Sequence, residues 1–382
     1  MTFLAPRLSS FYIAIFFVIG CMMPYWPVWL QARGMTGVEI GILTAIPVLG
    51  KVVFSPLFAS LGDKLGERKR LMLLFLASSF FCFALFFVAH SFYALFIISL
   101  LYGISWAPLM SFGDNVTLLA TRGGNIQYGR LRLWGSISFI VMSFGFGFVL
   151  EGRDVGIIYW TILGAIALTF LATLGLPDMR AMPLGRTGRP VRTLLKDRTF
   201  QIFMATVACI HGSHALYYGF ATLHWRAQDY SDAFIGFLWA EGVVAEVVFF
   251  IFGGRIGDRF GAASLLVFAA IACVVRWSVL ANDPDVIVLC LVQILHALTF
   301  GAMHLGAMNF ISRTVSVDFS ATAQSLYGAS AFGVGAGISL LFVGYFYELF
   351  SGGAFFIMTL LGIFGTLCGL VLRQREKCHI PA

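Results

Sequence analysis

The 382-residue chain is too hydrophobic to be a water-soluble protein. Hydrophobic residues make up 59% of it, charged residues only 11%, and its mean hydropathy is +0.90, values far from those of soluble domains. The formal net charge of +7 does not indicate nucleic-acid binding, because the basic residues are distributed as membrane topology requires. The composition therefore predicts a protein embedded in the lipid bilayer.

Apolar stretches of the length needed to cross a bilayer, about 20 residues each, follow one another along the whole chain. In chain order they cover 8–32, 38–60, 71–90, 92–120, 133–151, 156–176, 200–226, 232–253, 262–281, 285–312, 322–348 and 353–372. The first stretch is too long for a signal-peptide core and another span follows it, so we expect it to be retained. The sequence predicts an all-α membrane protein with twelve transmembrane helices.

The basic residues lie almost entirely on one side of these spans. With the N-terminus inside, 20 of the 25 Lys and Arg residues fall on the cytoplasmic side, and only Arg33, Arg153 and Arg226 fall on the outer side. Short loops rich in Lys and Arg remain in the cytoplasm. We therefore expect both termini to be cytoplasmic.

One loop pattern occurs twice, each time directly after a long apolar stretch. It reads LGDKLGERKR from Leu61 and GRIGDRFG from Gly254, which places Asp63 and Asp258 195 residues apart. A second echo, RLWGSISF from Arg132 and SLYGASAF, has nearly the same offset. Such repeats are typical of transporters that bind substrate between two halves.

The longest polar stretch, Pro177 to Thr199, separates the sixth and seventh spans. We therefore expect two pseudo-symmetric six-helix halves, 1–176 and 200–382, joined by a cytoplasmic linker, 177–199.

The repeated loop resembles the signature of the major facilitator superfamily, although Ala59 stands where its first glycine is usual. This resemblance implies the major facilitator fold and a gating role, in which each aspartate and its basic neighbours form an ion-paired latch that biases inward- and outward-open states. The residues assigned to this gating motif are Asp63, Lys64, Gly66, Arg68, Asp258, Arg259 and Gly261.

A narrower resemblance extends over nearly the whole chain. The segments PYWPVWL, YGRLRLWGS, HGSHALYYGF, GVVAEVV and QILHALTF are similar to those of bacterial 3-phenylpropionic acid transporters and, more distantly, of nucleoside and oligosaccharide proton symporters. The resemblance implies proton-driven import of a small aromatic carboxylate by alternating access in the bacterial cytoplasmic (inner) membrane. A nucleoside or sugar is the alternative substrate, and we expect a monomer.

Three charged residues lie deep within predicted spans, where a charge costs about 2.5–3.5 kcal/mol: Lys51, Asp114 and Glu246. Lys51 precedes Asp63 by twelve residues, and Glu246 precedes Asp258 by the same number. We infer that Lys51 and Glu246 face a shared cavity as an opposite-charge pair that couples substrate to protons. The alternative is a static ion pair between the halves.

Asp114 is a further candidate for proton coupling, and the repeat offset maps it onto Asn309. Its carboxylate could receive the proton on its way inward. It could equally accept hydrogen bonds from the nearby Arg130 and Arg132, because helix ends tolerate charge better than helix centres.

Histidines and other polar residues recur on one face of the seventh and tenth spans, and we expect them to bind substrate. Polar side chains on one face of an apolar span normally point inward, and histidine titrates near neutral pH. Each histidine alone could instead be a packing residue. The candidates are His211, His214, Tyr218, Gln293, His296 and His304.

Aromatic residues at the outer end of the first span are candidates for the outer part of the pocket, namely Tyr25 and Trp29. Their alternative role is in the aromatic belt of the membrane interface. For Arg276 in the ninth span we expect a structural role, either reaching the interface or pairing with Glu241.

The sequence does not indicate an enzyme. It contains no phosphate-binding GxxxxGK[ST] pattern, and its seven cysteines and seven histidines show no metal-site or disulfide spacing. We expect no cofactor beyond the proton gradient, no metal and no nucleic-acid partner, only a small-molecule substrate, protons and lipid. A non-transporting membrane sensor or scaffold is the alternative of another class.

Overall fold

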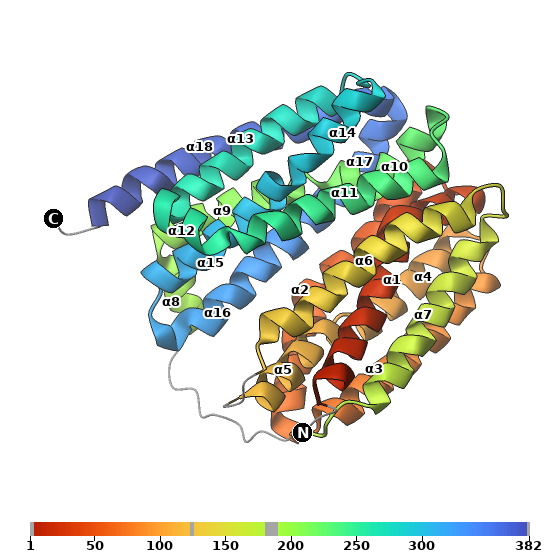
Figure 1. Cartoon of the computed structure of the whole chain (residues 1–382), viewed down its shortest axis with the longest axis horizontal. Coiled ribbons are helices and arrows are strands. Elements are labelled where there is room, and N and C mark those ends of the chain that lie inside the picture. Colours follow the sequence, from red (N-terminus) through yellow and green to blue (C-terminus); the bar gives the residue numbers. More distant parts are fainter. Residues whose placement is uncertain (1–3, 123–125, 180–189, 380–382) are drawn as a thin grey trace. The chain divides into compact units, whose positions relative to one another are not determined.

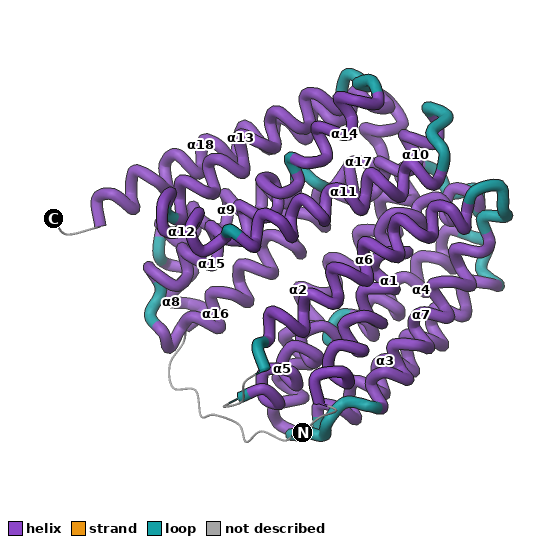
Figure 2. Tube along the Cα trace, in the orientation of Figure 1, coloured by secondary structure: helices purple, strands orange, loops and turns teal. Residues whose placement is uncertain are grey.

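The computed structural model describes residues 4–122, 126–179 and 190–379, and these form helices joined by short turns, with no strand among them (Figures 1 and 2). Within these ranges a few side chains, including those of Asp63, Lys64 and Asp258, lie outside the description. The chain is an all-α membrane protein whose helices form twelve spans.

The first six spans are formed by seven α-helices and one short 3-10 helix. In chain order these are α1 (Leu4–Ala32), α2 (Gly37–Leu65), α3 (Arg68–Ala84) with η1 (Leu85–Phe87), α4 (Phe92–Trp106) with α5 (Leu109–Thr121), α6 (Tyr128–Leu150) and α7 (Gly156–Leu174).

The other six spans follow a short helix, α8 (Pro190–Lys196), and several of them are interrupted. They are α9 (Arg198–Gly212) with α10 (Ala215–Ala227), α11 (Asp232–Ile251) with α12 (Gly253–Phe260), α13 (Ala262–Leu280), α14 (Val286–Ile294) with η2 (Ala297–Ala302) and α15 (Met303–Thr314), α16 (Val317–Gly328) with η3 (Ala329–Gly335) and α17 (Ala336–Phe350), and, after η4 (Ser351–Ala354), α18 (Phe355–His379).

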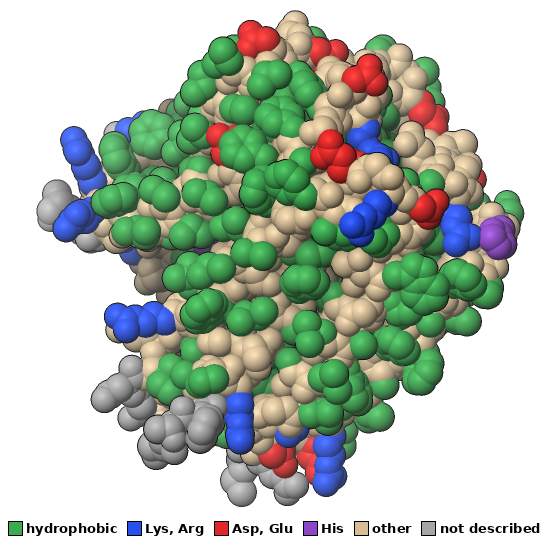
Figure 3. Space-filling model, turned by 45° about the vertical axis from the view of Figure 1, so that its right-hand side comes forward, with side chains coloured by type: hydrophobic (Ala, Val, Ile, Leu, Met, Phe, Trp, Pro, Cys, Tyr) green, Lys and Arg blue, Asp and Glu red, His purple; other side chains and the backbone are tan. Residues whose placement is uncertain are grey.

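Ten helical segments among the described residues are long and apolar enough to cross a membrane. Two features explain why ten segments make twelve spans. The seventh span is divided between α9 and α10, and the last two spans form one segment, Asp318–Glu376. Large apolar side chains such as Leu74 and Ile287 are 65% and 73% exposed, and Figure 3 shows apolar side chains spread over the face that it presents. Lipid is the solvent that suits such a surface.

The helices pack into two compact units. The first comprises Met1–Gly185 together with Ala221–Ala240, and the second comprises Arg186–Phe220 and Glu241–Ala382. In the first unit α1 packs against α6 and α7, and in the second α18 packs against α9 and α13. The expected boundaries at 176 and 200 stay a prediction.

Local sequence signals explain several helix ends. Thr36 and Glu39 form a capping box at the start of α2, and Gly66 ends that helix with a φ of 68°, a left-handed conformation that glycine adopts without a steric penalty. Ser91 and Asp285 accept hydrogen bonds from the first turns of α4 and α14. These caps satisfy backbone N–H groups that helix geometry leaves free.

Candidate functional site

A buried arginine is the centre of a polar network in the second unit. Arg276 on α13 is fully buried. Its Nη2 donates to Gln293 Oε1 at 2.7 Å, and its Nη1 donates to Thr299 Oγ1 at 3.1 Å. Nη1 also lies 3.0 Å from His296 Nδ1. The guanidinium lies 4.6 Å from the centre of the Tyr217 ring, within cation–π range.

The expectation that Arg276 reaches the interface or pairs with Glu241 is wrong. The side chain is enclosed by α14 and η2, against which α13 packs, and its hydrogen bonds are directed to acceptors on those elements. Glu241 Oε2 is itself buried and has no hydrogen-bond partner in the described structure.

The contacts of His296 define its protonation state. Arginine can only donate hydrogen bonds, so Nδ1 of His296 must accept, and the ring proton of the neutral form is then on Nε2. This Nε2 lies 3.5 Å from Glu246 Oε2, on α11. Arg276, His296 and Glu246 therefore form a line in which the imidazole connects a guanidinium to a carboxylate.

His214 has the opposite tautomer. Its Nδ1 lies 3.0 Å from the carbonyl oxygen of Ile210 and must donate to it, which leaves Nε2 to accept from Thr299 Oγ1, also at 3.0 Å. Thr299 in turn accepts from Arg276. The hydrogen bonds therefore run in one direction, from Arg276 through Thr299 and His214 to Ile210.

The break between α9 and α10 is stabilised by the same carbonyl. Ser213 Oγ donates to Ile210 O at 2.6 Å and accepts from Trp277 Nε1 at 2.8 Å. Helix ends leave carbonyl groups without an intrahelical partner, and here Ser213 and His214 supply the missing donors. Two π-helical segments, η2 and η3, also lie in this unit, and such segments are frequent at functional sites.

The structure brings together most of the candidates predicted in the second unit. His211, His214 and Tyr218 have ring centres 5.5–5.8 Å apart, as their spacing predicts. His296, Phe300 and His304 stack in a row, and His304 Nδ1 lies 3.1 Å from the Tyr327 hydroxyl. Their roles in binding stay predictions.

Asp114 is held by two tyrosines of the first unit. The hydroxyl groups of Tyr12 and Tyr128 donate to its Oδ1 at 2.8 and 2.9 Å. The Arg132 guanidinium lies over the rings of Tyr12 and Phe16. The hydrogen-bond donors are therefore tyrosines rather than the arginines considered from the sequence. Tyr12 and Tyr128 are 102 and 14 residues from Asp114 in the sequence. Helical periodicity therefore does not predict these contacts.

Replacing Tyr128 with phenylalanine is expected to lower the free energy of unfolding by about 1 kcal/mol, since the part-buried carboxylate of Asp114 loses one of its two donors. Denaturation in detergent measures the change. Tyr93→Phe is the matched control, because Tyr93 is 78% exposed, and it should leave stability unchanged. Equal stability of the two variants would show that the Tyr128 hydroxyl contributes nothing.

The remaining candidates of the first unit differ in their environment. Lys51 on α2 is exposed, and its pairing with Glu246 stays a prediction. Tyr25 and Trp29 are buried, where the Tyr25 hydroxyl donates to Ser143 O at 2.7 Å and the Trp29 ring stacks on Trp26 with centres 4.5 Å apart. These contacts make both rings part of the packed interior, and their contribution to a pocket stays a prediction.

The gating motif is described only in part. Gly66 ends α2, Arg68 begins α3 and is buried, and Gly261 ends α12 with a φ of 75°. The Arg259 guanidinium lies 5.5 Å from the Phe260 ring centre. The side chains of Asp63, Lys64 and Asp258 lie outside the described residues, so the ion-paired latch stays a prediction.

Comparisons with known proteins show what the chain is similar to. Residues 6–358 match the model of the MFS_1 like family. The chain is 30% identical to a probable 3-phenylpropionic acid transporter of Escherichia coli (strain K12), over 92% of this chain and 93% of that protein. It is 26% identical to the maltose permease of Geobacillus stearothermophilus, over 96% and 94%.

Solved structures share the fold at low sequence identity. A crystal structure of the nucleoside transporter NupG has a TM-score of 0.81 and 17% identity, with 98% of this chain and 99% of that chain covered. A bacterial homologue of the human lysosomal transporter Spinster, in an inward-facing and unoccupied conformation, has a TM-score of 0.78 and 14% identity, with 100% and 99% covered. The chain thus belongs to the MFS_1 like family of multi-pass membrane transporters.

Proposed function

We propose that the chain is a proton-coupled symporter that imports a small aromatic carboxylate, such as 3-phenylpropionate, by alternating access. Arg276 is the observation that carries this proposal. It is a fully buried cation whose described hydrogen bonds go to an amide, a hydroxyl and an imidazole, none of them a carboxylate. A buried charge needs a counterion, and a substrate carboxylate supplies one.

The Arg276–His296–Glu246 line supports coupling to protons. A second proton on His296 would occupy Nδ1, which now accepts from Arg276 Nη1. That protonation therefore releases the arginine while Glu246 stabilises the imidazolium. The released guanidinium is free to bind an anion, so proton uptake and carboxylate binding favour each other.

Other groups that face His296 are compatible with this role. The His214 ring centre is 6.0 Å and the Tyr217 ring centre 6.5 Å from that of His296. His214 is already bound to Ile210 and Thr299, which makes it a positioning residue. Glu246 is the acidic group in contact with His296, and we propose that its carboxylate serves proton coupling by pairing with the imidazolium that forms when His296 takes up the proton. Asp114 and Lys51 stay candidates for the same pathway.

The aromatic surroundings suit an aromatic substrate. The His211 ring lies 4.3 Å from Phe332 and 5.9 Å from Phe300, measured between ring centres. Rings at such separations bind one another through edge and face contacts. The similarity to a probable 3-phenylpropionic acid transporter supports the same substrate class.

The rival substrates are sugars and nucleosides, which the names of the maltose permease and of NupG suggest. Such neutral substrates would leave Arg276 without a counterion. We further propose that the protein is a monomer in the bacterial cytoplasmic membrane, with both termini in the cytoplasm, and that it uses the proton gradient without a cofactor.

Uptake of labelled 3-phenylpropionate into proteoliposomes tests the proposal. With an imposed proton gradient we expect saturable accumulation that a protonophore abolishes and that excess uridine or maltose does not inhibit. Protein-free liposomes are the essential control, because a lipophilic weak acid crosses bilayers unaided. Inhibition by uridine or maltose alone would favour the rival substrates. If none of the three compounds, 3-phenylpropionate, uridine and maltose, were taken up, a sensor or scaffold would be favoured.

A further inference from the structure

A groove lies between the first turns of α1 and the first turns of α6, in the first unit. Its volume is about 570 Å³, within the range of sites that bind small molecules. The residues that line it fall within 5–13 and 126–134. We call it the α1–α6 groove.

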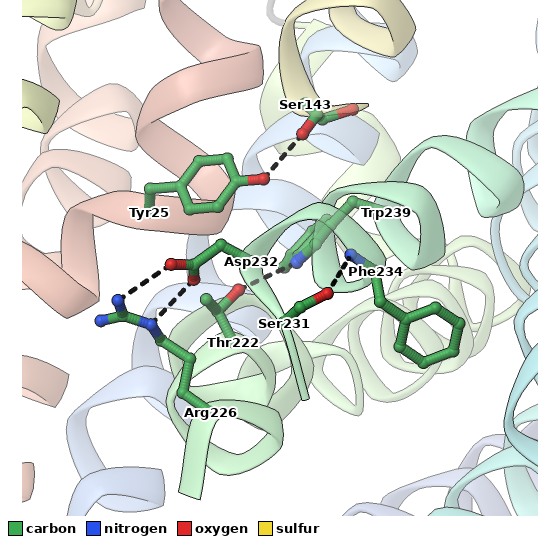
Figure 4. Close-up of polar contacts among 8 residues, drawn as sticks. All are labelled: Tyr25, Ser143, Thr222, Arg226, Ser231, Asp232, Phe234 and Trp239. Atoms are coloured by element: carbon green, nitrogen blue, oxygen red, sulfur yellow. Dashed lines mark hydrogen bonds and ion pairs between the residues drawn. The ribbon is translucent and has the colours of Figure 1, made fainter. Parts of the chain in front are cut away.

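The groove forms because α1 and α6 part only at their beginnings. Directly after the groove, Ser138 Oγ of α6 donates to the carbonyl oxygen of Ile13 on α1 at 2.7 Å. Farther along both helices, the Tyr25 hydroxyl of α1 donates to Ser143 O of α6 (Figure 4). The order of these contacts shows that the two helices run in the same direction. Both helices therefore begin at the groove.

The end of the groove at which the helices begin carries positive charge. The positive ends of two helix dipoles lie there, and Gln127 precedes α6 without a side-chain hydrogen bond to its first turn. Arg130, in that first turn, is exposed and lines the groove. No acidic residue is among the described residues that line it. This end of the groove is therefore suited to an anion.

A buried hydroxyl group at the same end indicates a ligand independently of the charges. Ser9 is only 8% exposed and lines the groove, and none of the described residues forms a hydrogen bond with its hydroxyl. The neighbouring Ser10, in contrast, donates to the carbonyl oxygen of Arg7. Burial of a hydroxyl is unfavourable unless a partner is supplied, and a phosphate oxygen would accept its hydrogen bond.

The opposite end of the groove is apolar and continues along α6. Trp134 lines the groove, and Ile137 and Val141 follow it on the same helical face. All three side chains are exposed. From Arg130 to Val141 the helix rises about 16 Å, close to half of the roughly 30 Å hydrocarbon thickness of a bilayer. This face has the length of a lipid acyl chain within one leaflet.

We propose that the α1–α6 groove binds an anionic phospholipid. Its phosphate pairs with Arg130 and accepts a hydrogen bond from Ser9, while one acyl chain lies along the exposed face of α6 from Trp134 onward. In the proposed orientation this end of the unit is cytoplasmic, and basic grooves between spans on that side suit anionic headgroups. A soluble anion would match the charged end but leave the apolar face uncovered. The lipid would connect the first turns of α1 and α6.

Quenching of tryptophan fluorescence by brominated lipids tests this site without any transported substrate. The full chain is placed in phosphatidylcholine vesicles that contain increasing fractions of phosphatidylglycerol brominated on its acyl chains. The signal of Trp134 is the difference between the unsubstituted protein and Trp134→Phe. In a parallel series the brominated lipid is phosphatidylcholine. We expect phosphatidylglycerol to quench Trp134 at a mole fraction about fivefold lower, the ratio that one basic residue contributes beside anionic lipid.

Arg130→Gln should remove this preference, because it removes the charge of the groove and keeps the apolar face, whereas Arg130→Lys should retain most of it. Arg373→Gln is the matched control, since Arg373 is an exposed arginine of α18 in the second unit, and it should leave the preference unchanged. Trp160, exposed on α7, should be quenched equally by the two lipids. All variants must elute as single species on size-exclusion chromatography.

Two results would overturn the proposal directly: equal quenching of Trp134 by the two lipids, or a preference for phosphatidylglycerol that survives Arg130→Gln. Relief of the quenching by soluble glycerol phosphate would also overturn it, because the groove would then hold a soluble anion instead of a lipid. None of these results depends on the proposed aromatic substrate, since the Arg276 network belongs to the second unit.

Discussion

Replacing Arg276 with glutamine is expected to reduce the uptake of 3-phenylpropionate about 100-fold or more, the largest effect of any single substitution in the second unit. The guanidinium is fully buried and joins Gln293, His296 and Thr299. Removing one partner of a buried, hydrogen-bonded charge pair costs about 2–5 kcal/mol, and each 1.4 kcal/mol corresponds to a factor of about ten. Loss of the proposed counterion for the substrate accounts for the decrease.

Arg276→Lys separates charge from geometry. Lysine keeps the positive charge but lacks the planar fork that reaches acceptors in two directions, so we expect uptake between that of the glutamine variant and that of the unsubstituted protein. The measurement is initial uptake in proteoliposomes at matched protein content, with folding checked by size-exclusion chromatography.

Arg33→Gln is the matched control for this series. Its guanidinium also approaches a histidine Nδ1, that of His90 at 3.1 Å, and also lies 4.6 Å from an aromatic ring centre, that of Trp29. Arg33 is only half-buried, however, its hydrogen bonds are exposed, and contacts of exposed charges contribute little. Uptake should remain close to that of the unsubstituted protein. A folded Arg276→Gln variant with uptake equal to that of Arg33→Gln would contradict the central role of Arg276.

The fold could be predicted from the sequence because the membrane imposes simple rules. Long runs of apolar residues in a bilayer must be helices, and the helices of the structure follow the predicted spans closely, as α1 and α13 illustrate with Leu4–Ala32 and Ala262–Leu280. Several spans are interrupted, and the seventh divides at Ser213 and His214. The residues at the break, His211 to His214, are polar or glycine, but in the sequence the two histidines indicate a binding face rather than a helix end. The break depends on side chains that bind the Ile210 carbonyl.

The candidate site could be predicted only in part. Helical periodicity correctly places His211, His214 and Tyr218 together, because that pattern is local. For Arg276 the sequence indicates only that the residue lies close to the outer end of the ninth span. That position favours a structural role. Its partners Gln293 and His296 are 17 and 20 residues away on another helix. Such contacts depend on how two helices pack, which a single sequence does not show.

Replacing Glu246 with glutamine is expected to abolish uphill accumulation of substrate while preserving exchange. The amide has nearly the same size as the carboxylate, and its oxygen can still accept from His296 Nε2, 3.5 Å away in the present structure. It cannot take up a proton or stabilise an imidazolium. Substrate should therefore bind and cross the membrane in counterflow, where no proton movement is needed, but a proton gradient should no longer drive accumulation.

Glu241→Gln is the matched control, because Glu241 lies on the same helix, about one and a half turns earlier. Glu241 is not a partner of Arg276, whose hydrogen bonds go to Gln293, His296 and Thr299. This variant should accumulate substrate as the unsubstituted protein does. The two assays, counterflow and gradient-driven uptake, distinguish a coupling residue from a structural one, since a disrupted fold would abolish both. Gradient-driven accumulation by Glu246→Gln would exclude Glu246 from proton coupling. His296 or Asp114 would then be the group to replace. His296→Gln would decide between them, because it removes the imidazole between Arg276 and Glu246. The same substitution leaves the contacts of Asp114 with Tyr12 and Tyr128 intact.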